Sequence, residues 1–192
     1  IQNYIYKNEG DFQFSNKSKD WGFDFAGYSN GMAYGDLDND GDLDLVVHNF
    51  NDPASVYRNT ISDRKVGHYL MVDLIGPALN PQGYGSKLTL TTERGMQFQE
   101  FWVVRGFESS CDQRIHFGIV ENDFIKELKV EWPDGSVQIV SSPEYDQHIQ
   151  LNHTDAKLLP KEKEESKPYF KKLSEESLFV HKENTYDDYE KE

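Results

Sequence analysis

The feature that most constrains the fold of this chain is a two-residue hydrophobic period that recurs between residues 68 and 154. In one run, Leu128, Val130 and Trp132 alternate with the charged residues Lys129 and Glu131. Successive side chains of a strand point to opposite faces, so this alternation predicts strands with one buried face. The runs that show it are YLMVDLIG, SKLTLTT, GMQFQEFWVV, RIHFGIV, FIKELKVEWP, SVQIVSS and HIQLNH. They predict seven short strands and no helix in this region.

Turn residues separate these runs. Asp134 and Gly135 lie between two alternating segments, which is a strong signal for a β-hairpin. Gly76-Pro77, Asn80-Pro81 and Ser142-Pro143 mark further turns. Short strands with regular turns are typical of sandwiches and barrels. We therefore expect an all-β chain, with a β-sandwich-like domain at 61–154.

The first 60 residues contain a weak internal repeat. The segment NYIYKN at 3–8 resembles ASVYRN at 54–59, a period of roughly fifty residues. A repeat of this length built from short strands indicates the blade of a β-propeller, so we expect one four-stranded blade at 1–60. A single blade cannot close a ring, and the chain does not begin with Met. We therefore expect it to be a piece of a longer protein. The charged segment 155–192 is predicted to be a linker and the beginning of a following repeat.

An aspartate-rich segment, GDLDNDGDLDLVV, lies at 35–47. Aspartates stand at every second position, as Asp36, Asp38, Asp40, Asp42 and Asp44. The order Asp-x-Asp-x-Asp-Gly corresponds to the first positions of the EF-hand loop, whose side-chain oxygens converge on calcium. Val47 stands where that loop needs its bidentate glutamate, and no helical pattern flanks the segment. The alternative of an acidic, solvated turn explains neither the spacing nor the glycine.

Electrostatics favours a bound cation in this segment. Two carboxylates about 5 Å apart repel by roughly 3 kcal/mol at an effective dielectric near 20. All-oxygen ligands favour Ca²⁺ over zinc or copper, and their number favours it over Mg²⁺. We predict that Asp36, Asp38, Asp40 and Asp44 bind Ca²⁺ through their side chains. Asp42 would bind it through its backbone carbonyl, with its side chain in water.

These motifs resemble two known families. The segment NGMAYGDLDNDGDLDLVVHN, with NYIYKNEGDFQFSN before it and SVYRN after it, is similar to FG-GAP/VCBS repeats, the calcium-loop blades of integrin-like propellers. The segments NPQGYGSKLTL, RGFESSCDQRIHFGIV and VEWPDGSVQ resemble the ASPIC/UnbV domain, which follows such repeats in cartilage acidic protein and in bacterial surface proteins. Ser110 and Ile119-Val120 depart from the usual family residues, Gln and Leu-Gly. The resemblance implies a fragment of a larger exported protein.

Other residues give weaker signals. The net charge of −14, with no basic segment, argues against binding to nucleic acid or to anionic membrane surfaces. No apolar run is long enough to insert in a membrane. His116 could be a ligand or a base, but a hydrogen-bonded strand histidine explains it more simply. Cys111 is expected to be a partly buried structural thiol. No catalytic residues are predicted.

We therefore expect a calcium-stabilised, non-catalytic module that binds or adheres to a protein or glycan. It would work outside the cell, at the cell surface or in the periplasm, next to neighbouring propeller blades. Two alternatives remain open: an accessory or catalytic part of a polysaccharide-processing enzyme, and a structural spacer between propellers.

Overall fold

The computed structural model describes residues 2–102, 104–106, 108–158 and 169–171. The described residues up to 158 belong to one compact unit. Most of the predicted linker and following repeat, at 155–192, lies outside the described residues. The described part is almost entirely strands, turns and loops, which confirms the all-β prediction. No helix within it has the length and apolar character to cross a bilayer.

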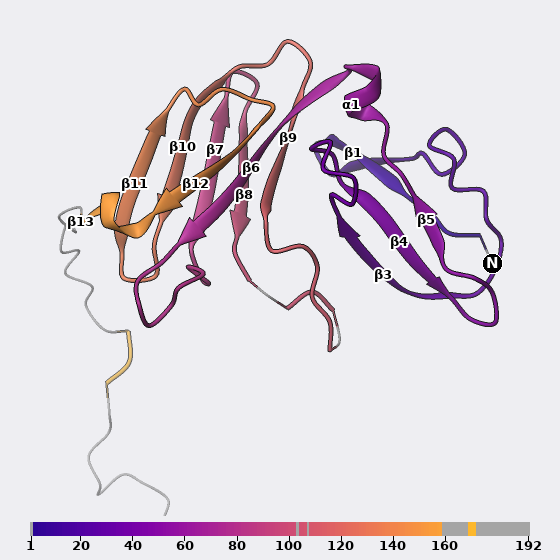
Figure 1. Cartoon of the computed structure of the whole chain (residues 1–192), viewed down its shortest axis with the longest axis horizontal. Helices are drawn as coiled ribbons and strands as arrows, with labels where there is room; N and C mark the ends of the chain where they lie inside the picture. Colours follow the sequence, from indigo (N-terminus) through magenta and orange to yellow (C-terminus); the bar gives the residue numbers. More distant parts are fainter. Residues whose placement is uncertain (1, 103, 107, 159–168, 172–192) are drawn as a thin grey trace, which may run out of the picture. The chain divides into compact units, whose positions relative to one another are not determined.

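The N-terminal region forms two small sheets (Figure 1). A hairpin pairs β1 (Tyr6–Gly10) with β2 (Gln13–Asn16), and a separate sheet has the order β3 (Ser29–Gly35), β4 (Asp44–Asn49), β5 (Ser55–Tyr57). The predicted single four-stranded blade is therefore not confirmed, because the described strands of this region form a two-stranded and a three-stranded sheet. The segment after β2 turns on itself, with Trp21 N donating to Lys17 O (2.8 Å) and Phe23 N donating to Ser18 O (2.7 Å). These turns lie between β2 and β3, which are not paired with each other.

Polar side chains join the parts of this region. Asn3 Nδ2 donates to Ser29 Oγ (2.9 Å), which in turn donates to Asn49 Oδ1 (2.8 Å). Asn49 Nδ2 also donates to Ser55 Oγ (2.9 Å), and Asn49 is only 2% exposed. A buried amide must find such partners, because an unsatisfied one would cost about 1–3 kcal/mol. This series of hydrogen bonds, which runs from Asn3 to Ser55, therefore links both ends of the N-terminal region.

A short helix, α1 (Ile61–Arg64), leads into the second domain, which has two sheets. All seven strands predicted between 68 and 154 are present, as β6 to β12, and the hairpin at Asp134-Gly135 joins β10 to β11. The first sheet has the order β13-β11-β10-β7-β8 and the second the order β12-β6-β9. Their bounds are β6 (Gly67–Ile75), β7 (Lys87–Thr92), β8 (Met96–Glu100), β9 (Ile115–Val120), β10 (Ile125–Glu131), β11 (Ser136–Ser141) and β12 (Gln147–Asn152).

The end of this domain differs from the predicted boundary at 154. After β12, a 3₁₀ turn at His153–Asp155 leads into β13 (Lys157–Leu158), which pairs with β11 through Ser136 and Val137. The first sheet therefore continues to Leu158, inside the segment predicted as a linker. A two-residue strand has too little periodicity to be recognised from sequence.

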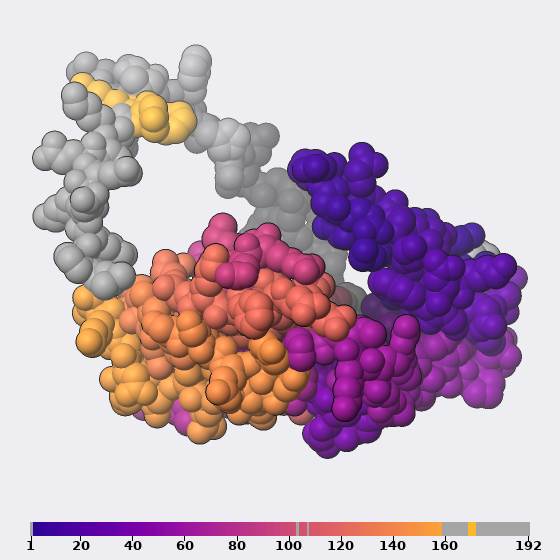
Figure 2. All heavy atoms as spheres, turned by 90° about the horizontal axis from the view of Figure 1, so that it is seen from above, coloured from indigo at the N-terminus to yellow at the C-terminus, as the bar shows by residue number. Residues whose placement is uncertain are grey.

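One apolar core lies between the two sheets. Side chains from both contribute, and Leu70, Leu88, Leu90, Phe117 and Leu128 are completely inaccessible to solvent. Alternation explains this set, since every second residue of each strand faces the partner sheet. The cluster comprises Leu70, Val72, Leu74, Leu88, Leu90, Phe101, Ile115, Phe117, Ile119, Ile125, Leu128, Val130, Trp132 and Leu151. Figure 2 shows the later residues of the domain, in orange, forming one continuous surface in that view.

Two edge strands of this domain, β8 and β9, are joined through side chains. Gln97 Nε2 donates to Gly118 O (2.7 Å), and Gln99 Nε2 donates to His116 O. Both acceptors are backbone carbonyls of β9, and both donors belong to β8. The two sheets are thus connected at this edge by glutamine amides rather than by a backbone ladder.

Candidate metal centre

The aspartate-rich segment forms the loop between β3 and β4. Gly35 pairs with Asp44, so the residues between them turn back within one tight connection. Asn39 and Gly41 have positive φ angles of 59° and 94°, as a sharp turn requires. The Asp36 carboxylate accepts hydrogen bonds from the backbone N–H of Asp40 (3.1 Å) and of Gly41 (3.2 Å). The loop is therefore wrapped around the side chain of Asp36.

Three of the predicted ligands converge. One carboxylate oxygen from each of Asp36, Asp38 and Asp40 lies within 4.8 Å of the others. Calcium binds oxygen at about 2.3–2.6 Å, so two ligands of one ion lie at most about 5 Å apart. The three side chains therefore fit a shared calcium ion. Asp36 is 7% exposed, whereas Asp38 lies on the surface, so the cluster faces solvent on one side.

The environment of the Asp42 side chain differs from the predicted one. The sequence placed its side chain in water, but it is only 5% exposed, and its Oδ2 accepts a hydrogen bond from Ser62 N (2.9 Å). Its Oδ1 is buried and has no hydrogen-bond partner among the described residues. Burial raises the pKa of Asp42. The correction arises because the residues that follow β5 cover this side chain, which spacing within the loop does not reveal.

Asp44 lies outside the converging group. Its Oδ2 accepts from Leu37 N (3.1 Å), its Oδ1 accepts from Asn59 N (2.7 Å), and it is 3% exposed. As the first residue of β4, it ties the loop to the chain after β5. Its predicted role as a fourth calcium ligand stays a prediction.

Arg58 is a basic residue at this site that the sequence did not single out. Its Nε lies 2.6 Å from Asp38 Oδ2, and one Nη lies 3.3 Å from Asp40 Oδ2. The other Nη lies 3.0 Å from Asp63 Oδ2. The hydrogen bond from Arg58 lowers the pKa of Asp38, and its partners raise the pKa of Arg58. Arg58 therefore neutralises part of the loop's negative charge.

A second basic residue, Arg114, reaches the loop from the domain. It forms a forked ion pair with Asp112, and its Nη2 donates to Asp36 O (3.0 Å). Another Nη of Arg114 lies 3.8 Å from Asp36 Oδ2. Burial raises the pKa of Asp112, but hydrogen bonds from Arg114 outweigh it and hold that pKa below its usual value. This pair connects the segment before β9 to the loop.

Two further residues of the second domain, His116 and Tyr69, contact the aspartate loop. His116 Nε2 lies 2.8 Å from Gly41 O, and since a carbonyl only accepts, Nε2 carries the proton. Burial lowers the pKa of His116, which favours the neutral ring. A Cβ on Gly41 would lie only 1.9 Å from the Tyr69 ring. His116 is thus a hydrogen-bonded strand histidine whose acceptor belongs to the aspartate loop. Cys111, by contrast, is a half-buried free thiol.

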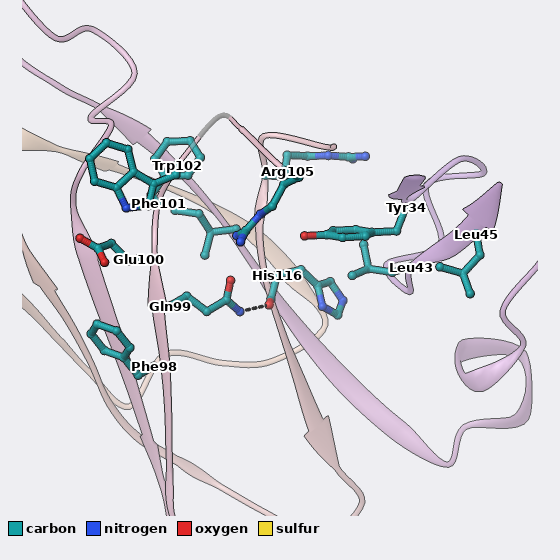
Figure 3. Close-up of a pocket in the computed structure, with 12 residues that line it drawn as sticks. Tyr34, Leu43, Leu45, Phe98, Gln99, Glu100, Phe101, Trp102, Arg105 and His116 are labelled. Carbon is teal, nitrogen blue, oxygen red and sulfur yellow. Dashed lines mark hydrogen bonds between the residues drawn. The ribbon is translucent and has the colours of Figure 1, made fainter. Parts of the chain in front are cut away.

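A cleft of about 710 Å³ lies beside this contact. Figure 3 shows Tyr34, Leu43 and Leu45 facing residues of β8 and the segment that follows it. Phe98 and Trp102 remain 60% and 54% exposed. Among the described residues, the Arg105 guanidinium has no ion-pair or hydrogen-bond partner. A cavity of this size, with aromatic walls and a few polar groups, is typical of small-ligand sites.

The comparisons with known families agree with both halves of the chain. The family described as FG-GAP-like repeat matches residues 2–47, and the family described as ASPIC and UnbV matches residues 76–158. No curated protein matches the chain. The first match includes all five aspartates of the loop, and the second includes β7 to β13. The chain therefore carries an FG-GAP-like repeat followed by an ASPIC/UnbV domain, two β modules of the extracellular type.

Proposed function

We propose that this chain is a non-catalytic extracellular module in which calcium stabilises the loop of the FG-GAP-like repeat. The observation that carries the proposal is the convergence of Asp36, Asp38 and Asp40 oxygens within 4.8 Å. In the same loop, the buried Asp42 Oδ1 has no hydrogen-bond partner among the described residues, and a water bound to the cation could supply one. In this proposal calcium has a structural role: its positive charge offsets the repulsion between the carboxylates.

Because the loop also contacts the ASPIC/UnbV domain, calcium bound to the loop would stabilise the contact between the repeat and the domain. Arg114 and His116 of the ASPIC/UnbV domain both bond to backbone carbonyls of the loop, those of Asp36 and Gly41. A cation that fixes the loop also fixes these carbonyls. Extracellular calcium is millimolar, which suits the affinity of about 10⁻⁴–10⁻³ M expected of extracellular modules.

Calcium-dependent thermal stability tests this proposal. The melting temperature of the chain should rise in millimolar calcium relative to chelator, because a ligand that binds only the folded state stabilises it. The double variant Asp38→Ala/Asp40→Ala should lose this rise. Asp24→Ala/Asp52→Ala is the matched control, since it removes the same charge from exposed positions that have no ion pair among the described residues. Identical melting temperatures in calcium and chelator for the parent would contradict the proposal.

The second part of the proposal concerns recognition of a protein or glycan. The cleft of about 710 Å³ favours it, because exposed Phe98 and Trp102 can stack on a sugar ring or an apolar side chain. Arg105 adds a guanidinium that has no ion pair within the described part of the chain. The competing possibilities are a part of a polysaccharide-processing enzyme and a spacer between propellers. A glycan array and a hydrolase panel separate the three, since a spacer gives no signal on either.

The cleft itself can be tested with one pair of variants. Trp102→Ala should weaken the binding of a glycan or protein. Trp21→Ala removes a similarly exposed ring from the repeat and should leave that binding unchanged. Turnover of a polysaccharide that is abolished by a point change in residues 68–152 would favour the enzyme instead.

A further inference from the structure

Arg58 is positioned by the repeat itself. It follows β5 directly, and the next residue, Asn59, is fixed at both ends: its N–H donates to Asp44 Oδ1 (2.7 Å) and its Nδ2 donates to Leu43 O (3.3 Å). These bonds hold the chain at Arg58 against the end of the aspartate loop. The guanidinium therefore reaches the carboxylates from a fixed point.

We propose that Arg58 is a tethered cation that competes with calcium for the aspartate loop and so lowers the affinity of the loop for the metal. This inference rests on the proposed calcium site. Its basis is that the guanidinium contacts two of the three converging carboxylates, Asp38 at 2.6 Å and Asp40 at 3.3 Å. Both residues must offer oxygens to a calcium ion in the same cluster.

Charge arithmetic gives the direction of the effect. Arg58 reduces the charge of the three-carboxylate cluster by one unit, and its own positive charge repels a divalent cation bound there. For a unit charge about 5 Å from a divalent ion, full screening by water, at a dielectric near 80, leaves a repulsion that corresponds to roughly tenfold in affinity, and this is the lower limit of the effect. In return, Arg58 holds the loop together when calcium is scarce, because it bridges carboxylates that would otherwise repel each other.

Asp63 on α1 is a third partner of Arg58, in contact at the same time as Asp38 and Asp40. Its Oδ2 lies 3.0 Å from the second Nη of Arg58, and Asp63 is not among the converging carboxylates. An Arg58 displaced from Asp38 and Asp40 therefore keeps one ion pair. Asp63 thus limits the cost of displacing Arg58 when calcium binds.

Calcium titration by calorimetry, with melting temperatures in chelator, tests this role on the whole chain. The variant Arg58→Gln should bind calcium roughly tenfold more tightly and melt at a lower temperature in chelator than the parent. Lys7→Gln is the matched control, because Lys7 occupies the equivalent position of the internal repeat and pairs only with Glu9 among the described residues. The control should leave calcium affinity unchanged.

The outcomes separate this inference from the calcium proposal. Unchanged or weaker binding by Arg58→Gln, with a parent that binds, overturns the role of Arg58 and leaves the calcium site standing. Binding by Arg58→Gln alone, with a silent parent, supports Arg58 as the competing cation. If neither binds, the calcium proposal fails and this inference fails with it.

Asp63→Asn supplies an independent check. It should weaken calcium binding in the parent, because Arg58 then has only the loop carboxylates as partners. The same change should have little effect in the Arg58→Gln background, since its action passes through Arg58. An equal loss of affinity in both backgrounds would show that Asp63 acts through its own charge and would overturn the partner role.

Discussion

The FG-GAP-like repeat and the ASPIC/UnbV domain bury opposite kinds of side chain. Among the described residues of the repeat, Val47 is the one buried apolar side chain, whereas Ser18, Asp36, Asp42, Asp44 and Asn49 are buried and polar. The domain instead contains the whole apolar core cluster. Large apolar side chains of the repeat, including Phe14 and Met32, are exposed. The domain is therefore stabilised by burial of apolar area, and the repeat by polar bonds and by whatever neutralises its aspartates.

Exposed apolar side chains on both sheets of the repeat suit a module that packs against others of its kind. Tyr6 and Phe14 lie on the hairpin, and Met32 and Val56 lie on the three-stranded sheet. Large exposed apolar side chains become buried where a module meets a partner. We propose that neighbouring blades of a propeller are the partners that cover it.

The largest expected difference between the two regions comes from removing one phenylalanine from each of them. Phe117→Ala should lower the free energy of unfolding by about 3–5 kcal/mol, because Phe117 is completely buried in the core. Phe14→Ala, at a side chain 60% exposed, should change it by less than about 0.5 kcal/mol. Urea unfolding at neutral pH measures both. Similar losses for the two variants would contradict the assignment of the core to the domain.

A second prediction concerns the point where the two regions meet. Gly41→Ala should cost about 2–4 kcal/mol, because Gly41 has a φ of 94° and its new Cβ would meet the Tyr69 ring. Gly31→Ala is the control, since nothing lies within 4 Å of its Cβ position and it has no positive φ. Urea unfolding again gives the difference. A Gly41→Ala variant as stable as Gly31→Ala would show that Tyr69 does not pack on the loop.

The third prediction tests the ion pair of Arg114 separately from the packing of Gly41 against Tyr69. Arg114→Gln should cost about 1–2 kcal/mol, because it leaves the half-buried Asp112 without its ion pair and removes a bond to Asp36 O. Arg64→Gln removes an exposed arginine that has no ion pair among the described residues and should be nearly neutral. Equal effects on thermal unfolding would mean that the contact contributes nothing beyond net charge.

The smallest expected effect is a pH dependence within the domain. Hydrogen bonds from Ser136, with His153 adding to them, lower the pKa of Asp134 from 3.8 to about 2. The folded state therefore holds this proton more weakly than the unfolded chain, so the contribution is present above pH 4 and is lost as the pH falls through 2. The melting-temperature gap between the parent and Asp134→Ala should shrink over that range. A gap independent of pH would contradict the assignment.

Local patterns explain which features could be predicted from the sequence. The seven strands of the domain follow from alternation within each run, and the hairpin at Asp134-Gly135 follows from two adjacent residues. The convergence of Asp36, Asp38 and Asp40 is also local, because their spacing and Gly41 suffice to close the turn.

The remaining features depend on residues distant in sequence. Asp42 is covered through Ser62, and Gly41 accepts from His116, so neither environment can be read from the loop alone. Arg58 stands beyond β4 and β5, and its pairing with Asp38 requires the fold of the whole sheet. A hint existed, since a basic residue follows Tyr in both copies of the internal repeat. The arrangement of the repeat in two sheets was also not predicted, since the segment between β2 and β3 carries no strong pattern.

The glutamine bridges at the edge of the domain have a consequence for self-association. A strand edge with free carbonyls can template the addition of a strand from another molecule, which is the first step of aggregation. On β9, the carbonyls of His116 and Gly118 already accept hydrogen bonds from Gln99 and Gln97. An incoming strand would have to displace both amides, so these side chains protect the edge of β9 from unwanted pairing.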